Sequence, residues 1–268
     1  MKVVLFCGGA GMRLRGYSED VPKPMVTVGS RPVLWHIMKY YAHFGHKDFI
    51  LCLGYKANVI KDYFLDYEES VSNDFVFSQG GRKLEFMQRD IDDWNITFVD
   101  TGLRATIADR LRFVEPYLGG DEIFLANYSD GLTDFYLPQM IQEFSHRDSY
   151  ASFLSVQPRS SSLDTVQADE DGRVRAVKSM KDASIWVNGG YFVLRKDIFR
   201  YINAGEELIY EPFQRLIGEG RVWSPRYEGF WQCMDTFRDK QLLDEMEASG
   251  TAPWRLWKNG RSVPGIVA

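Results

Sequence analysis

Short apolar runs alternate with segments of helical periodicity through the first half of the chain. The pattern predicts, in order, a strand near residues 2–7, a helix near 31–44, a strand near 48–53 and a helix near 56–66. In the first helix, Ser30 is the expected N-cap, Pro32 lies in the first turn, and Gly45 is the expected stop. Strands that alternate with helices are typical of a parallel sheet whose faces are covered by helices.

The second half of the chain continues this alternation. Further helices are expected near 107–118, 137–145, 208–218 and 236–247, and further strands near 84–87, 96–99, 123–126, 151–156, 173–177, 190–194 and 221–227. No repeat, low-complexity tract or long linker interrupts the chain, and the polar segment 157–185 has room for an appended lobe. We therefore predict one α/β domain over residues 1–268, with a Rossmann-like, mostly parallel sheet flanked by helices and a small appended lobe.

Composition narrows the possible partners. The chain has 268 residues, of which 45% are hydrophobic, so it can bury a large core. Its net charge of -5 gives no overall basic surface, and we find no local basic patch, so we expect a small-molecule partner and no nucleic acid. No stretch of about 18 apolar residues predicts a membrane span, and the apolar start at 2–7 is too short for a signal peptide. These features predict a cytoplasmic protein with no membrane partner.

Several groups carry no predicted site. The cysteines have no metal-type or redox-type spacing, and two of them lie in apolar runs where a thiol acts as a small hydrophobe: Cys7 and Cys52, with Cys233 as the third. Three histidines are expected to cap or pack a helix and not to bind a metal: His36, His43 and His46. A solvated loop is expected at Asp90, Asp92 and Asp93. Core or subunit contacts are expected for Trp231, Trp254 and Trp257.

A glycine-rich loop directly follows the first predicted strand, where ligands bind in open α/β sheets. It reads Gly8-Gly9-Ala10-Gly11-Met12-Arg13-Leu14. Glycines allow successive backbone N–H groups to turn around an anion, and Arg13 adds a fork of donors suited to phosphate oxygens. The spacing is neither that of the dinucleotide-binding motif nor that of the P-loop. A purely structural tight turn is the alternative.

A lysine lies between two prolines ten residues after Arg13. Each proline fixes its own φ and restricts the residue before it, so the backbone of Lys23 is held by Pro22 and Pro24. On its own such a lysine is an ordinary solvated charge. Together with the glycine loop, it becomes a candidate for contact with a phosphate group.

Two aspartates are candidates for a metal site. Asp130 follows the apolar run 123–127, at the carboxyl end of a predicted strand and so at the same edge of the sheet as the glycine loop. Asp235 follows an aromatic stretch and precedes a predicted helix. Mg²⁺ takes one or two carboxylates and completes its octahedron with water and phosphate oxygens. A turn or a helix N-cap is the alternative for either aspartate, above all for Asp235, because Thr236 and a helix follow it.

The glycine loop and the Pro-Lys-Pro segment together resemble the start of the sugar nucleotidyltransferase family, which has G-G-x-G-x-R-L followed by P-K-P. The resemblance is closer to the glucose-1-phosphate cytidylyltransferase branch and covers about residues 1–257. The matching segments are, in order, 32–38, 48–50, 54–56, 59–61, 99–102, 130–131, 188–190, 192–194, 211–212, 230–232, 234–236 and 252–254. This collinear set is far more specific than any one motif.

The resemblance implies a role for each matching residue. It implies catalytic roles for Lys23 and Arg13, Mg²⁺ binding by Asp130 and Asp235, sugar contact by Asn188, and nucleotide binding by Gly8, Gly9, Gly11, Met12, Arg13, Arg110 and Ser129. For two of these residues an alternative without a binding role stays open. Arg110 could be a solvated helix residue, and Asn188 could be a β-turn residue. The resemblance further implies a nucleotide-binding part at about 1–150, and a sugar-binding and C-terminal part at about 151–268 that includes the appended lobe.

The implied reaction joins a nucleoside triphosphate to a sugar 1-phosphate and releases pyrophosphate, with Mg²⁺ as cofactor. A phosphate monoester is largely dianionic at neutral pH, because its second pKa is about 6, so no general base is required. Positioning and charge neutralisation are then the main catalytic tasks. CTP and glucose 1-phosphate are the leading pair because this branch uses them. Another base or hexose, and a non-catalytic sugar-nucleotide sensor, are the alternatives. A homo-oligomer is also implied, without its order.

The chain departs from its relatives at the expected sugar site. Many family members carry Glu-Lys-Pro there, with the glutamate on the sugar hydroxyls, whereas this chain reads Lys178-Ser179-Met180-Lys181. Ser129 also replaces the usual glycine before Asp130, which brings a side chain to a place where backbone normally approaches the ligand. Loss of a hydroxyl-binding carboxylate should relax or redirect the choice of sugar. We therefore expect a hexose 1-phosphate that need not be glucose, with Lys178 or Lys181 supplying positive charge.

Overall fold

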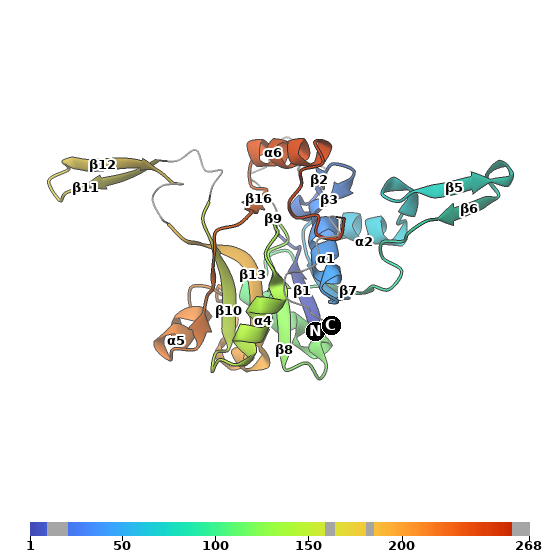
Figure 1. The fold of residues 1–268 in the computed structure, drawn as a ribbon. Coiled ribbons are helices and arrows are strands. Elements are labelled where there is room, and N and C mark those ends of the chain that lie inside the picture. Colours follow the sequence, from blue (N-terminus) through green and yellow to red (C-terminus); the bar gives the residue numbers. More distant parts are fainter. Residues whose placement is uncertain (10–20, 159–163, 181–184, 259–268) are drawn as a thin grey trace.

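The computed structural model describes residues 1–9, 21–158, 164–180 and 185–258 (Figure 1). An eight-stranded sheet forms its centre, in the order β14-β10-β13-β8-β1-β4-β7, with β15 also paired to β10. These strands are β1 (Lys2–Phe6), β4 (Asp48–Leu53), β7 (Asn95–Asp100), β8 (Ile123–Asn127), β10 (Ala151–Val156), β13 (Val187–Arg195), β14 (Val222–Trp223) and β15 (Arg226–Tyr227). Only β13 runs antiparallel to its sheet neighbours. The predicted mostly parallel α/β sheet is confirmed.

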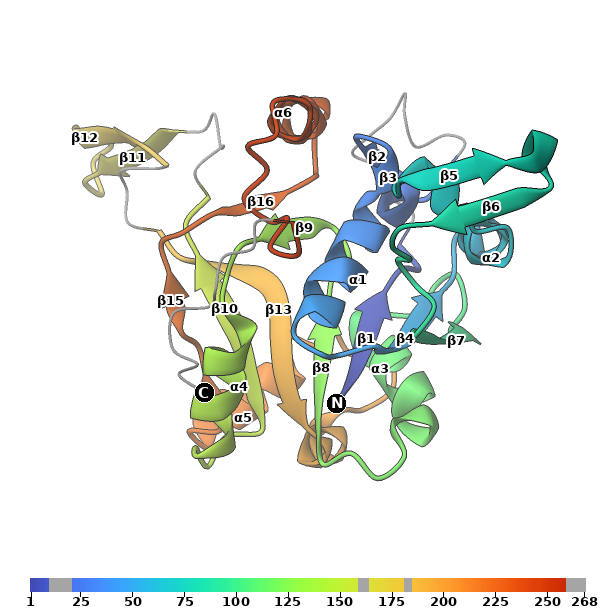
Figure 2. The same ribbon diagram turned by 45° about the vertical axis from the view of Figure 1, so that its right-hand side comes forward.

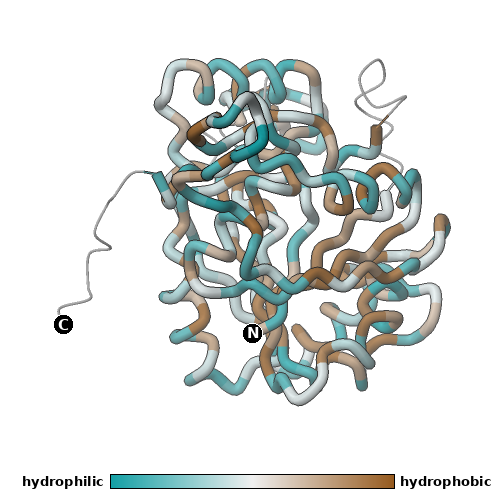
Figure 3. Tube along the Cα trace, turned by 90° about the vertical axis from the view of Figure 1, so that its right-hand side faces the viewer, coloured by the Kyte–Doolittle hydropathy of each residue, from teal (hydrophilic) through white to brown (hydrophobic). Residues whose placement is uncertain are grey.

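Helices cover both faces of this sheet (Figure 2). Along β1, Val3 and Leu5 join the core under one face and Val4 and Phe6 join the core under the other, as the two-residue repeat of a strand requires. The first core contains side chains of α1 (Val33–His43), α2 (Ala57–Leu65), α4 (Leu137–Ser145) and α6 (Phe237–Ala248). The second contains side chains of α3 (Ile107–Val114) and α5 (Pro212–Gly218). Hydrophobic segments accordingly run through the interior in Figure 3.

The start of α1 differs from the prediction. Pro32, with φ -60° and ψ 151°, is the N-cap, and Ser30 has no such role. The reason is that Arg31–Pro32 forms β3, which pairs with β2 (Thr27–Val28) and keeps the chain extended up to the helix. Gly45 follows the helix with φ 85°, a conformation that favours glycine, so the predicted stop is confirmed.

Three other elements are shorter than predicted. The helix expected at 208–218 begins only at Pro212, which is pre-organised for a first helical turn, and the residues before it form a loop. The strand expected at 221–227 is split into β14 and β15 around Ser224 and Pro225, because proline has no N–H for a strand ladder. The helix expected at 107–118 is α3 followed by a 3-10 turn at Glu115–Leu118.

Two β-ribbons extend from the body on opposite sides, at the end of the molecule towards which β1 points (Figure 1). One is formed by β5 (Phe75–Ser78) and β6 (Lys83–Phe86), and the other by β11 (Asp164–Ala168) and β12 (Val174–Ser179). The second ribbon occupies the segment where the sequence left room for a lobe. Strands β5 and β11 were not predicted.

Asp90 is not the solvated loop residue that was expected. Its side chain is 7% exposed and accepts hydrogen bonds from Lys39 (3.0 Å), Tyr67 (3.1 Å) and Asn73 (2.9 Å). This carboxylate therefore ties the base of the first ribbon to α1, while Asp92 and Asp93 are exposed as expected.

Several of the side chains that were expected to pack in the core do so. Cys7, Cys52 and Trp254 are buried in the core. His36 is also buried, where its Nδ1 accepts the Trp254 indole N–H at 3.3 Å and its Nε2 lies 2.9 Å from the carbonyl of Val28. No described helix combines the length and apolar character that a bilayer-crossing segment needs.

Candidate active site

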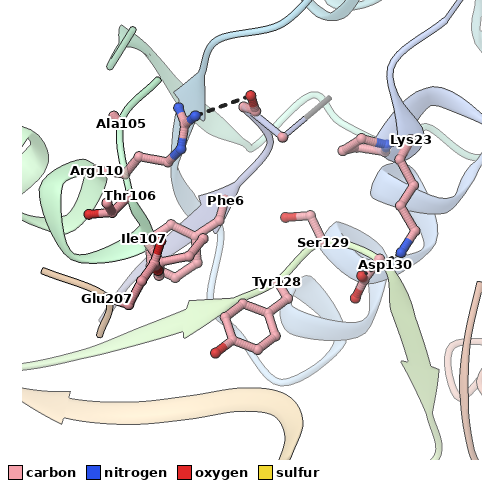
Figure 4. Close-up of a pocket in the computed structure, with 13 residues that line it drawn as sticks. Phe6, Lys23, Ala105, Thr106, Ile107, Arg110, Tyr128, Ser129, Asp130 and Glu207 are labelled. Carbon is pink, nitrogen blue, oxygen red and sulfur yellow. Dashed lines mark hydrogen bonds and ion pairs between the residues drawn. The ribbon is translucent and has the colours of Figure 1, made fainter. Parts of the chain in front are cut away.

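A cavity of about 380 Å³ opens at the carboxyl ends of β1 and β8 (Figure 4). Parallel strands bring their carboxyl ends to one edge of a sheet, where ligands of open α/β folds bind. The cavity is lined by Phe6, Gly8, Gly9, Lys23, Pro24, Ala105, Thr106, Ile107, Arg110, Tyr128, Ser129, Asp130 and Glu207. All the predicted nucleotide-binding and catalytic residues in the described part of the chain are therefore brought together.

Lys23 lies between the two candidate metal-binding aspartates. It begins the 3-10 helix η2 (Lys23–Met25), with Pro22 as its extended N-cap, so the backbone restraint that the sequence suggested is present. Its Nζ donates to Asp130 Oδ2 at 2.7 Å and also to Asp235 Oδ1. Burial alone would lower the pKa of Lys23, but the charges and hydrogen bonds of the two aspartates outweigh burial and raise it. Lys23 is thus a firmly charged ammonium at the cavity wall.

Two short strands explain how Asp130 and Asp235 meet. β9 (Gly131–Thr133) pairs antiparallel with β16 (Trp231–Cys233), with Gly131 opposite Cys233. Asp130 precedes the first of these strands and Asp235 follows the second, so the ladder brings both carboxylates to the same end. Neither strand was predicted, because three residues are too few to show a two-residue repeat.

Thr236, and not Asp235, caps the helix that follows. The hydroxyl of Thr236 accepts the N–H of Asp239 at 3.2 Å, and Asp239 Oδ2 accepts the N–H of Thr236 at 2.8 Å. This reciprocal capping box provides hydrogen-bond partners for backbone N–H groups at the start of α6. The N-cap interpretation of Asp235 is therefore wrong, and its carboxylate faces Lys23.

Arg110 is buried, so the solvated-helix interpretation is also wrong. Its guanidinium donates to the carbonyls of Leu53 and Gly8, each at 3.1 Å, and to Thr101 Oγ1 at 2.5 Å. These acceptors follow or end three neighbouring strands, β4, β1 and β7. Burial lowers the pKa of Arg110, although carboxylates such as Glu207 oppose that shift. Arg110 therefore clamps three strand ends beneath the cavity.

Gly8, the first residue of the glycine loop, packs closely against the Arg110 guanidinium. A Cβ atom built at Gly8 would lie 2.0 Å from Arg110 Nη1, so a larger residue would displace the guanidinium. Gly54, which no site prediction included, is equally confined, because its Cβ would lie 2.8 Å from the carbonyl oxygen of Gly8. Its position directly after strand 48–53, at the same edge of the sheet, was the available signal.

Ser129 has a left-handed backbone, with φ 64°, which favours glycine. The N–H of Ser129 donates to Asn127 Oδ1 at 2.7 Å, which stabilises this conformation. Its hydroxyl is fully buried, 3.6 Å from Cys7 Sγ. The serine side chain therefore packs into the cavity wall.

Of the predicted sugar-site residues, the two that the structure describes, Asn188 and Lys178, do not line the cavity. Asn188 belongs to β13 and not to a β-turn, and its Oδ1 accepts the N–H of Gly190 at 2.9 Å while its Nδ2 lies 3.4 Å from the Tyr128 hydroxyl. It therefore contacts Tyr128, which lines the cavity. Lys178 is exposed on β12, in the projecting ribbon (Figure 1). Gly11, Met12, Arg13 and Lys181 lie outside the described residues.

Comparison with known proteins identifies the family. A model of the nucleotidyl transferase family matches residues 2–236. The chain belongs to this family. It is 38% identical over 262 residues to the glucose-1-phosphate cytidylyltransferase of Salmonella typhi, across 96% of this chain and 100% of that protein. It is 33% identical over 259 residues to the probable glucose-1-phosphate cytidylyltransferase of Bacillus subtilis, with the same coverage of both chains.

Solved structures share the fold of this nucleotidyltransferase at lower identity. HddC from Yersinia pseudotuberculosis superposes with a TM-score of 0.68 at 19% identity, over 92% of this chain and 99% of that one. A UDP-glucose pyrophosphorylase complexed with UDP-glucose gives a TM-score of 0.66 at 14% identity, over 93% and 98% of the two chains. The Rossmann-like architecture is therefore shared.

The carboxylates of this nucleotidyltransferase suit a magnesium ion. Asp130 and Asp235 are both anchored on one ammonium, so their oxygens converge on one place. Mg²⁺ needs only one or two carboxylates, with water and phosphate oxygens as its remaining ligands. Across the described residues, no group of three or more His, Cys, Asp or Glu side chains is placed to hold a metal ion.

Proposed function

We propose that this nucleotidyltransferase joins CTP to glucose 1-phosphate and releases pyrophosphate. The observation that carries the proposal is the contact of Lys23 with both Asp130 and Asp235 at the wall of a cavity whose next wall is Gly8 and Gly9. A fixed cation, two carboxylates and glycine backbone are the groups that phosphoryl transfer requires. The names of the relatives at 38% and 33% identity support the base and the sugar.

The chemistry is an in-line displacement at phosphorus. An oxygen of glucose 1-phosphate forms a bond to the α-phosphorus of CTP, and the bond from that phosphorus to the bridging oxygen of the β-phosphate breaks. Pyrophosphate leaves with the electron pair. The attacking phosphate is already largely dianionic at neutral pH, so no protein base has to remove a proton.

Each group of the cavity has a part in this displacement. Lys23 interacts with the charge that develops on the transferred phosphoryl group, where a fixed cation is most effective. Gly8 and Gly9 offer backbone to the triphosphate, and Arg13 is expected to add donors there. Asp130 and Asp235 would hold Mg²⁺, which when bound neutralises charge on the phosphate oxygens. Arg110 supports the glycine loop from beneath.

A different hexose 1-phosphate is the second candidate. The expected glutamate position is occupied by Lys178, which lies on the exposed ribbon and not at the cavity. No carboxylate from that segment is available in the described residues to select the hydroxyls of glucose. We therefore propose that the choice of sugar is relaxed or redirected. The enzyme should then be less selective for the sugar 1-phosphate than for the nucleoside triphosphate.

Pyrophosphate release from a matrix of nucleoside triphosphates and sugar 1-phosphates tests the proposal. Turnover with CTP and a hexose 1-phosphate that requires Mg²⁺ is the expected result. Binding of a sugar nucleotide without any pyrophosphate release would instead indicate a sensor that keeps the fold. A homo-oligomer and a cytoplasmic location are further expectations, which light scattering and cell fractionation can test.

A further inference from the structure

Glu207 lines the cavity although no motif or resemblance included it. Figure 4 shows Glu207 beside Ile107 and Thr106, on the side of the cavity away from Lys23. It comes from the loop 203–211, which connects the 3-10 helix η6 (Lys196–Tyr201) to α5. A carboxylate at this place needs an explanation, because Lys23 at the other end of the cavity is proposed to interact with phosphate groups.

The loop that carries Glu207 is fixed on both sides. The N–H of Gly205 donates to Asp109 Oδ1 at 2.9 Å, which joins the loop to the first turn of α3. Glu206 pairs with Arg215 of α5, with Arg215 Nη1 at 3.0 Å from Glu206 Oε1. The backbone N–H of Glu207 itself donates to Glu211 Oε2 at 2.9 Å. The position of Glu207 is therefore set by its neighbours.

The Glu207 carboxylate, in contrast, has no partner within residues 1–9, 21–158, 164–180 and 185–258. The charge of Glu207 acts to raise the pKa of Arg110. The Arg110 guanidinium, however, donates its hydrogen bonds to Leu53, Gly8 and Thr101. The scaffold thus holds this acidic side chain at the cavity and leaves its oxygens for another donor.

The chemistry of that donor follows from charge. A carboxylate repels phosphate groups, so Glu207 faces an uncharged part of a substrate. An ionised carboxylate only accepts hydrogen bonds, so its partner is an N–H or O–H group. Glu207 is exposed in the free protein, with Phe6 and Ile107 as apolar wall beside it. A substrate that covers this wall would displace water from the carboxylate, which would then be costly to leave without a donor. These conditions favour discrimination between substrates that have and lack one donor.

We propose that Glu207 is a specificity-determining residue of this nucleotidyltransferase, accepting a hydrogen bond from an amino or hydroxyl group of a bound substrate. The inference rests on the proposed function. Two substrates carry such a donor at a neutral end, the cytosine of CTP through its amino group and the hexose through its hydroxyls. Carboxylates accept from the cytosine amino group in other recognition settings.

Substrate preference ratios test this role and separate the two sources. We would measure kcat/KM for CTP against UTP at fixed glucose 1-phosphate, and for glucose 1-phosphate against galactose 1-phosphate at fixed CTP. The proteins are the wild type, Glu207→Ala, Glu207→Gln and the control Glu122→Ala, whose exposed side chain lies outside the cavity. Thermal unfolding of each variant confirms that it folds.

Glu207→Ala should reduce one of the two ratios by about tenfold or more, and Glu207→Gln should reduce it less because its amide keeps an acceptor oxygen. A change in the CTP/UTP ratio identifies the base as the donor, and a change in the glucose/galactose ratio identifies the sugar. Wild-type turnover with both ratios unchanged in Glu207→Ala would overturn the role of Glu207 alone. A wild type without turnover on any pair would overturn the proposed function and this role with it.

Discussion

The backbone N–H of Met234 donates to the carbonyl of Asp130 at 2.8 Å, one step beyond the β9–β16 ladder. This bond continues the pairing to the point where the chain turns from β16 towards α6. Asp235, the next residue, is thereby held beside Asp130, and both carboxylates reach Lys23. The arrangement of charged groups at the cavity thus depends on backbone pairing between segments that are far apart in the sequence.

Lys23→Ala should lower turnover far more than it weakens nucleotide binding. The interaction assigned to Lys23 strengthens as charge develops in the transition state, and loss of one such donor typically costs about 10²–10³ in rate. Pyrophosphate release gives kcat, and calorimetric titration gives the Kd for the nucleotide. Lys61→Ala on α2, outside the cavity, is the control. Near-normal kcat in Lys23→Ala would show that Lys23 only holds the two aspartates.

Asp130→Asn and Asp235→Asn should each remove most of the magnesium-dependent activity. Each change removes a ligand charge with little change in side-chain volume, so the fold should remain. Titration with Mg²⁺ in the presence of nucleotide measures the lost affinity, with the exposed Asp92→Asn as control. If the metal dependence of Asp235→Asn matches that of the wild type, Asp235 serves Lys23 and not the metal.

Arg110→Ala should destabilise the fold as well as the site. It removes three hydrogen bonds, to Leu53, Gly8 and Thr101, and each hydrogen bond typically contributes about 0.5–1.5 kcal/mol, with more for a charged donor. The free energy of unfolding in urea should therefore fall by about 3 kcal/mol.

Gly8→Ala should be costly for a related reason, because the added Cβ would meet the Arg110 guanidinium at 2.0 Å. In the Arg110→Ala background this conflict is absent, so the same change should cost less. A double-mutant cycle on the free energy of unfolding should give a coupling of at least about 1 kcal/mol. Additive effects would mean that the glycine is needed for backbone reasons alone.

The sequence was most informative where signals lay close together in the chain. The place of Lys23 at the cavity could be predicted from its flanking prolines together with the glycine loop, and that of Asp130 from its position after an apolar strand. The pairing of Asp130 with Asp235 could not, because it depends on two strands of three residues each. Polarity also misled at Asp90, whose burial comes from partners on other elements. Glu207 was missed because one acidic residue in a polar loop gives no sign of facing a cavity.

The buried His36 should make the fold sensitive to acid. Burial is the main cause that lowers its pKa from the ordinary 6.5 to about 4, and nearby Arg255 and Arg31 act in the same direction. Its two ring nitrogens are engaged as a neutral imidazole, one accepting from Trp254 and the other meeting the carbonyl of Val28.

Above pH 6.5 neither the folded nor the unfolded chain protonates this histidine. As the pH falls below 6.5, the unfolded chain takes up a proton that the folded chain refuses until about pH 4. Folded-state stability should therefore fall across this window, by up to about 3 kcal/mol at one pKa unit per 1.36 kcal/mol. Urea unfolding at pH 7.5, 6, 5 and 4 measures the slope. His36→Gln, which does not titrate, should flatten it, whereas the exposed His146→Gln should not. Because His46 also has a pKa lowered to about 4, part of the slope should persist in His36→Gln. A slope identical to that of the wild type would mean that His36 is protonated equally in both states.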